Sequence, residues 1–106
     1  MNDVTIANSR RGEAMIVVGG KARVLRPTFN ALVGAEEELG PLFALVERAG
    51  EGRLGLQDLA TLFWHCIADR GSLTREQVGE AVLEMGLAGS AKPLGMVLRQ
   101  ILQGGG

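Results

Sequence analysis

The chain has few of the residues that most often carry out chemistry: one Cys, one His, one Trp and no Tyr among 106 residues. A single Cys cannot form a disulfide within the chain, which fits a reducing compartment. One His and one Cys supply too few strong ligands for a zinc site. The scarcity of aromatic residues excludes a stacking platform for single-stranded nucleic acid. Disulfide scaffolds, zinc proteins and single-strand binders are therefore disfavoured.

An excess of positive charge is also missing, because 11 Lys and Arg residues face 12 Asp and Glu residues, for a formal net charge of −1. Nucleic-acid affinity depends on neutralising phosphates, so we expect no nucleic-acid partner. No apolar run approaches the roughly 20 residues of a membrane helix, and the first residues lack a signal-peptide pattern. We expect a cytoplasmic protein without membrane association.

What is present is a balanced globular composition, with 46% hydrophobic and 22% charged residues. This length and composition predict one compact domain. The fold class that we expect is α+β, mainly α, with an N-terminal β-hairpin followed by about five short helices. Residues 1–12 are expected to form a flexible arm, residues 13–103 the domain, and residues 104–106 a disordered glycine tail.

The hairpin is predicted by two β-rich runs that flank Gly19 and Gly20. Tight hairpin turns require positive φ, which Gly adopts without steric cost. The two-residue loop sets the register: Val18 with Lys21, Val17 with Ala22, Met15 with Val24, and Glu13 with Arg26. We expect the face carrying Met15, Val17, Ala22 and Val24 to be buried. Ile16 and Val18, opposite Arg23 and Lys21, then lie on the exposed face.

Helix boundaries are indicated by capping residues. Thr28 can cap the first helix, Gly40 can end it, and Pro41 suits the first position of the next helix. Thr74 and Gln77 form a capping box, and Gly86 is a natural stop. The expected helices are residues 28–39, 41–50, 56–69, 74–86 and 90–103.

The stretch "FWHC" holds the only Trp, His and Cys of the chain side by side. Neighbouring residues on a helix point about 100° apart, so His65 and Cys66 cannot chelate one ion or act as a nucleophile–base pair. The apolar spacing places Phe63 and Cys66 in the core, His65 on the polar side, and Trp64 on the flank. We expect no catalytic residue, metal site, cofactor or small-molecule substrate, and hence not an enzyme.

The run Glu36, Glu37, Glu38 stands near the end of a predicted helix. Consecutive helical side chains fan out over an arc, so these carboxylates do not converge on one ion. A solvated acidic face is the simplest interpretation, and it leaves room for contact with a basic partner surface.

Several apolar residues lie off the predicted buried stripes, and they either complete the core or dock another protein. These candidate partner-binding residues are Ile16, Val18, Leu62, Trp64, Leu83, Leu87 and Met96, joined by Glu36 and Glu37.

The order of three segments resembles a known family. They are "RGEAMIVVGGKARVLRPTFNALVGAEEELG", "ALVERAGEGRLGLQDLATLFWHCI" and "LTREQVGEAVLEMGLAGSAKPLGMVLRQIL". Together they are similar to the small tail protein of gene-transfer-agent-type particles, a family grouped with the tail assembly chaperones of long-tailed phages. The resemblance spans roughly residues 11–102 and contains no catalytic motif.

The resemblance implies a non-enzymatic tail assembly chaperone that coats the tape-measure protein until tail-tube subunits displace it, with self-association as a further expectation. The alternative is a structural minor tail or tail-tube-associated component of the particle. A small helical transcription regulator is a third class, but the last two predicted helices carry only Arg75, Lys92 and Arg99 as basic residues.

Overall fold

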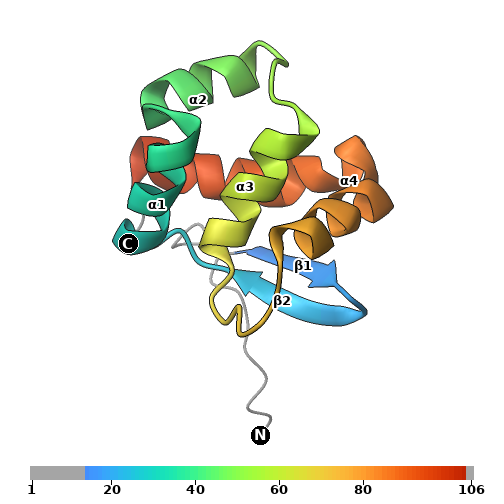
Figure 1. Ribbon diagram of the computed structural model, residues 1–106. Helices are drawn as coiled ribbons and strands as arrows, with labels where there is room; N and C mark the ends of the chain where they lie inside the picture. The colour runs from blue at the N-terminus through green and yellow to red at the C-terminus, as the bar shows by residue number, and fades with distance from the viewer. Residues whose placement is uncertain (1–13, 105–106) are drawn as a thin grey trace, which may run out of the picture.

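The computed structural model describes residues 14–104, and it begins with an antiparallel hairpin of β1 (Ala14–Val18) and β2 (Lys21–Leu25) (Figure 1). Gly19 and Gly20 form the turn with φ of 62° and 76°, as their position predicts. The predicted pairing of Val18 with Lys21, and of the residues that follow, is confirmed. The N-terminal arm, the pairing of Glu13 with Arg26, and the last two glycines of the tail lie outside the described residues.

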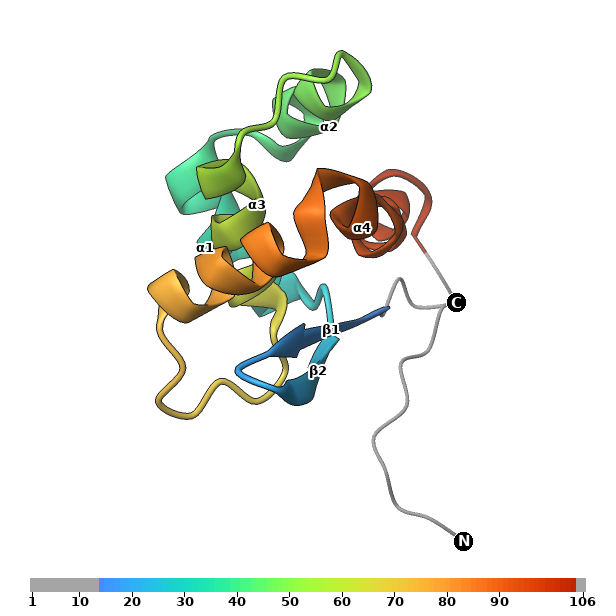
Figure 2. The same cartoon turned by 90° about the vertical axis from the view of Figure 1, so that its right-hand side faces the viewer.

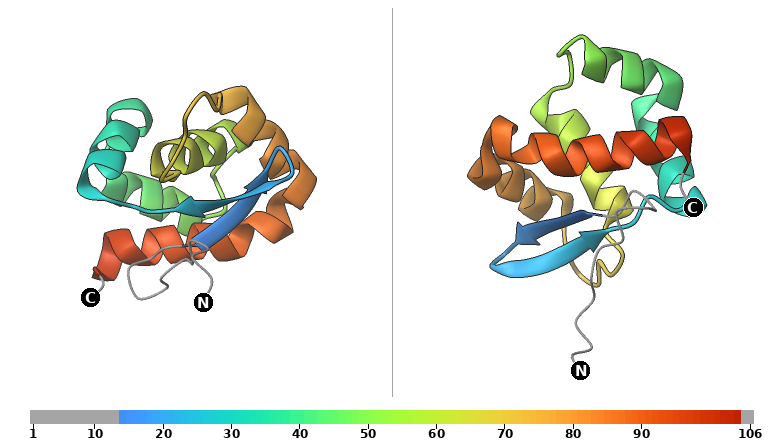
Figure 3. Two further views of the ribbon diagram at one scale, coloured as in Figure 1. Left: turned by 90° about the horizontal axis from the view of Figure 1, so that it is seen from below. Right: turned by 180° about the vertical axis from the view of Figure 1, so that it is seen from behind.

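The buried face of β1 is the opposite of the predicted one. Ile16 and Val18 are buried, whereas Met15 and Val17 are exposed. The reason is that α4 (Arg75–Gln103) packs against β1, and Figure 3 shows the strand next to this helix. Lys and Arg opposite a core residue do not prevent its burial, because their long apolar stems can cover it while the charged ends stay in water.

The second strand continues into a contact with the end of α3 (Leu56–Cys66). Leu25 forms an isolated antiparallel bridge with Ile67. The N–H of Ala68 donates to the carbonyl of Val24 at 2.9 Å, and the N–H of Arg26 donates to that of Cys66 at 2.6 Å. Because these backbone groups bond to the hairpin and the residue after it instead of continuing the helix, α3 ends at Cys66 and not at the predicted residue 69.

The first two helices are α1 (Phe29–Leu39) and α2 (Leu42–Gly50), which follow their predicted boundaries closely. The hydroxyl of Thr28 accepts a hydrogen bond from the N–H of Ala31 at 3.2 Å, which satisfies a free donor at the start of α1. Gly40 ends α1 with φ of 85°, a value that favours Gly. The capping residues therefore identified these ends correctly.

Within residues 14–104 the structure has four helices instead of about five, because the last two predicted helices form one 29-residue element, α4. The predicted stop at Gly86 is nevertheless visible, since this residue has φ of 76° and ψ of 164° and breaks the helical path. The helix resumes at once, without the predicted loop before Ser90. The Ser90 hydroxyl donates to the carbonyl of Gly86 at 2.9 Å, which satisfies this carbonyl at the start of the second segment.

The helices lie above the hairpin in the view of Figure 1, and α3 contacts both α1 and α4 (Figures 1 and 2). Leu62, Phe63 and Cys66 of α3 are buried at the centre of the core. The prediction that Leu62 lies off the core is thus wrong. Although α4 is long and apolar enough to cross a membrane by length and composition, it buries Val78 and Val97 in the same core.

Candidate partner-binding surface

The single Trp is covered by side chains of this chain. The guanidinium groups of Arg70 and Arg75 lie 4.0 and 4.4 Å from the centre of the Trp64 ring. The indole N–H donates to the carbonyl of Leu73 at 3.2 Å. Cations over an indole face are attracted by its π electrons, and the N–H has the partner that a half-buried indole requires. Trp64 therefore anchors the connection between α3 and α4, and it is half-buried.

His65 belongs to an electrostatic cluster that joins three helices. Its Nε2 lies 2.6 Å from Oε2 of Glu38 on α1, and Arg75 at the start of α4 forms a bidentate ion pair with the same carboxylate. The bonds from Arg75 and then from His65 lower the pKa of Glu38 from 4.5 to about 2. A methyl group on Gly34 would lie 2.8 Å from Nδ1 of His65, so glycine at this position leaves room for the ring.

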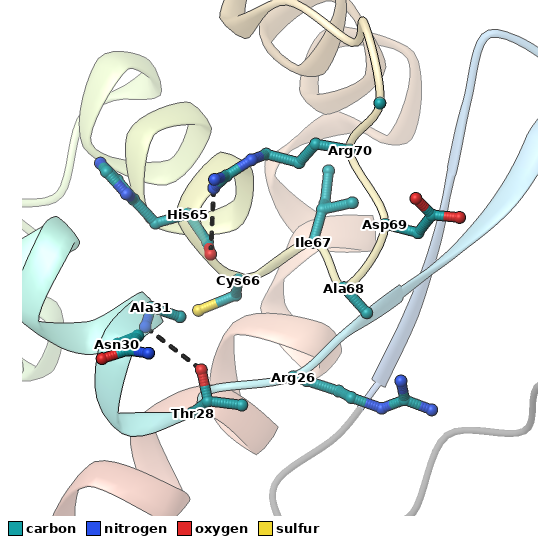
Figure 4. A pocket seen from close by; sticks show the side chains of 11 residues that line it. Arg26, Thr28, Asn30, Ala31, His65, Cys66, Ile67, Ala68, Asp69 and Arg70 are labelled. Carbon is teal, nitrogen blue, oxygen red and sulfur yellow. Dashed lines mark hydrogen bonds between the residues drawn. The ribbon is translucent and has the colours of Figure 1, made fainter.

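Cys66 lies beside a polar cavity of about 590 Å³ between the connection from β2 to α1, the start of α1 and the segment after α3. Figure 4 shows its sulfur pointing toward Ala31, while Arg70 extends back over the end of α3. Burial raises the pKa of the Cys66 thiol to about 12, so it is not a nucleophile at neutral pH. The described residues include no group of three or more His, Cys, Asp and Glu side chains placed to hold a metal ion.

The three consecutive glutamates, Glu36, Glu37 and Glu38, lie in three different environments. Oε2 of Glu36 accepts a hydrogen bond from the N–H of Leu42 at 3.1 Å, which caps α2, since Pro41 supplies no side-chain bond there. Glu38 pairs with α3 and α4 as described above. Glu37 alone is exposed without a polar contact among the described residues. Of the two acidic partner-binding candidates, Glu36 thus has a role within the chain.

The apolar partner-binding candidates also differ in their exposure to solvent. Leu83 and Leu87 of α4 are 64% and 62% exposed, as predicted, and Met96 is half-buried. Ile16 and Val18 belong to the core and offer no surface to a partner. Leu62 is excluded for the same reason. Among the predicted apolar residues, Leu83 and Leu87 are the two that are mostly open to solvent.

Two exposed aromatic residues were missed. Phe29 and Phe43 are 81% and 78% exposed, at the first turns of α1 and α2. Phe29 lies near one side of its helix together with Leu32, Val33 and Leu39, so its spacing does not mark it as exposed. Leu42, Leu45, Val46 and Ala49 follow helical spacing on one face of α2, and Phe43 lies off that face. This offset is the signal in the sequence that indicates its exposure.

Next to the exposed part of α4 is a small apolar cavity of about 170 Å³. It lies between the second half of α4 and the connection from α2 to α3. Its lining residues are Ala49, Gly52, Leu54, Leu59, Leu87, Ser90, Ala91 and Leu94. Leu87 therefore forms part of both the cavity wall and the open surface.

Residues 11–104 match the sequence profile of the family described as "Phage tail tube protein, GTA-gp10", one of the tail assembly chaperone families. The chain belongs to this family. No curated protein and no solved structure gives a significant match. The expected resemblance to gene-transfer-agent tail proteins is confirmed. Tail assembly families of this kind are generally non-enzymatic, and their partners are other tail proteins.

Proposed function

We propose that this protein is a non-enzymatic tail assembly chaperone that binds the tape-measure protein during tail assembly. The family match over residues 11–104 carries this proposal. A tape-measure protein is a long helical chain, and its apolar stripes require cover before the tube forms. Binding such a stripe requires exposed apolar side chains on the chaperone, because an amphipathic helix is held by burial of its apolar face.

The exposed side chains support this function. Phe29, Phe43, Leu83 and Leu87 are each more than three-fifths exposed, although large apolar side chains bury favourably at about 25 cal/mol per Å² of apolar surface. They lie on three different helices. A client that wraps around the protein could cover several of them.

Tail-tube subunits are the proposed competitors that release the client, and the cytoplasm of the bacterial host is the proposed location. Self-association is a further proposal. β2 contacts the segment after α3 on one side, whereas β1 pairs within the described residues with β2 alone. Within residues 14–104, no strand pairs with the other edge of β1, which supports this proposal.

Co-expression with the tape-measure protein of the same particle tests the function. We expect the tape-measure protein to become soluble and to elute from a sizing column together with this chain. Equal solubility with and without the chain, together with separate elution, would refute the proposal.

The alternative is a structural component of the tail, and the words "tail tube" in the family description favour it. The described residues contain a sheet of only two strands, so they supply one hairpin per subunit to a tube closed by β-sheet. Mass spectrometry of purified mature particles separates the two functions. A stoichiometric amount of this chain would favour the structural component, and its absence the chaperone.

A further inference from the structure

We infer that the surface at the bend of α4 binds an amphipathic helix whose apolar stripe is bordered by Lys or Arg. We name this surface the α4 ridge and define it as Glu76, Glu80, Leu83, Glu84 and Leu87 together with the adjoining apolar cavity. The inference rests on the proposed function for the identity of the client, but not for the chemistry of the surface.

The apolar part of the ridge consists of two leucines on either side of the break at Gly86. Leu83 and Leu87 are 64% and 62% exposed. The 170 Å³ cavity continues from Leu87 toward Leu54 and Leu94. Figure 2 shows this bend of α4 with α2 and its following loop above it. A leucine-sized side chain of a partner would contact apolar groups on several sides there.

The acidic part of the ridge is a regular series. Glu76, Glu80 and Glu84 are four residues apart, so they follow one another along the helix, and all three are exposed. None of them forms an ion pair within the described residues. Glu76 suits the first turn, where the helix dipole favours negative charge. Glu80 and Glu84 have no such compensation, and like charges at this spacing destabilise a helix.

The charges of the α4 ridge indicate which kind of partner binds there. Its two leucines lie beside carboxylates that have no ion-pair partner within the described residues. Such a surface is complementary to a helix that presents apolar side chains at helical spacing with basic side chains beside them. A helix of the tape-measure protein with this pattern is the occupant that we assign. A second copy of the chain, using Lys21 and Arg23 of its hairpin, is the competing occupant that the experiments must separate.

The first experiment uses two synthetic helical peptides of about 20 residues, a length at which helices are stable enough to form. Both carry Leu at helical spacing, one with Lys and the other with Glu at the flanking positions. Fluorescence anisotropy should show that the Lys peptide binds about tenfold more tightly than the Glu peptide at low salt. Equal binding of the two peptides would overturn the inference.

Exposed residues provide variants with matched controls. Leu83→Gln with Leu87→Gln should weaken binding of the Lys peptide about tenfold, whereas Leu102→Gln, also exposed, should not. Glu80→Gln with Glu84→Gln should remove the preference for the Lys peptide, and Glu37→Gln with Glu47→Gln should leave it unchanged. Circular dichroism confirms that each variant is folded. A loss of binding that is equal in test and control variants would contradict the assigned surface.

Co-expression with the tape-measure protein separates the two proposals. If the wild-type chain forms a complex and the Leu83→Gln, Leu87→Gln variant does not, both stand. If the variant still forms the complex, the α4 ridge is not the binding surface, and the proposed chaperone function is retained. If the wild-type chain forms no complex with the tape-measure protein, the proposed chaperone function is refuted. The peptide experiment alone then tests whether the α4 ridge binds a basic amphipathic helix. Light scattering that shows a dimer disrupted by this variant would assign the ridge to a second copy and overturn the inference.

Discussion

Replacing Glu38 with Gln removes the charge that joins α1 to α3 and α4. The carboxylate pairs with Arg75 and His65, which are 37 and 27 residues away along the chain. Gln keeps the size of the side chain but cannot accept a bidentate, charge-assisted bond from Arg75. We therefore expect a folded but less stable protein.

The magnitude follows from exposure. Hydrogen bonds to charged groups contribute about 1.5–3 kcal/mol where they are protected, and exposed ion pairs about 0.2–1 kcal/mol. The Glu38 side chain is 36% exposed, so solvent screening places its loss near the lower range, at about 1 kcal/mol. For a domain of this size that lowers the melting temperature by about 4–8 °C.

The pH dependence provides a more specific signature. The pKa of Glu38 is lowered from 4.5 to about 2 in the folded protein. A carboxyl group with a lowered folded pKa stabilises the fold above its unfolded pKa, and this contribution is lost as pH falls. The difference in unfolding free energy between wild type and Glu38→Gln should thus be larger at pH 5 than at pH 2. It should decrease between pH 4.5 and 2.

Thermal unfolding followed by Trp64 fluorescence is the assay, because the indole lies against Arg70 and Arg75 in the folded state. The neighbouring Glu37 is exposed, so Glu37→Gln is the matched control and should change the melting temperature little. If both variants melt alike, or if the wild-type advantage does not decrease in acid, the assigned role of Glu38 is refuted.

Three further predictions concern other contacts. Gly34→Ala should lower stability by about 1 kcal/mol in urea unfolding, because its methyl group would lie 2.8 Å from the His65 ring; in a His65→Ala background the same change should stabilise the helix. Cys66, whose thiol pKa is about 12, should react with a thiol reagent at pH 8 only after denaturation, and rapid labelling of the native protein would contradict its burial. Gly86→Ala should cost about 1–3 kcal/mol because its φ and ψ belong to a region used almost only by Gly; an unchanged melting temperature would show that the helix can straighten without cost.

The sequence determines local features of this fold well. Gly19 and Gly20 specify the hairpin register because few other residues adopt their φ values, and Thr28 and Thr74 mark helix starts through bonds to residues three positions away. Each of these signals depends on a few consecutive residues. Their energetic cause is contained within the segment itself.

The buried face of the hairpin could not be predicted in the same way. Both faces of β1 are apolar, so alternation does not distinguish Ile16 and Val18 from Met15 and Val17. The contact with α4 determines which face of β1 is buried, and this helix is more than 50 residues away along the chain. The early end of α3 at Cys66 has a similar origin, since the backbone bonds to Val24 and Arg26 come from a distant strand.

The candidate surface was predicted in part. Leu83 and Leu87 were recognised because they lie off the buried stripe of a clear amphipathic helix. The sequence does not determine whether Trp64 is covered, because its cover comes from tertiary contacts with Arg70 and Arg75. The electrostatic cluster of Glu38, His65 and Arg75 was missed, since its members are dispersed along the chain and each alone resembles an ordinary surface residue.

The break at Gly86 also sets the size of the molecule. A straight helix of 29 residues would be about 44 Å long at 1.5 Å per residue, which exceeds the 40 Å longest dimension of the protein. The bend therefore lets a helix longer than the domain fold back onto it. Gly86 divides what would be one long helix into two shorter segments that meet at an angle. Leu83 lies in the segment before the bend and Leu87 in the segment after it.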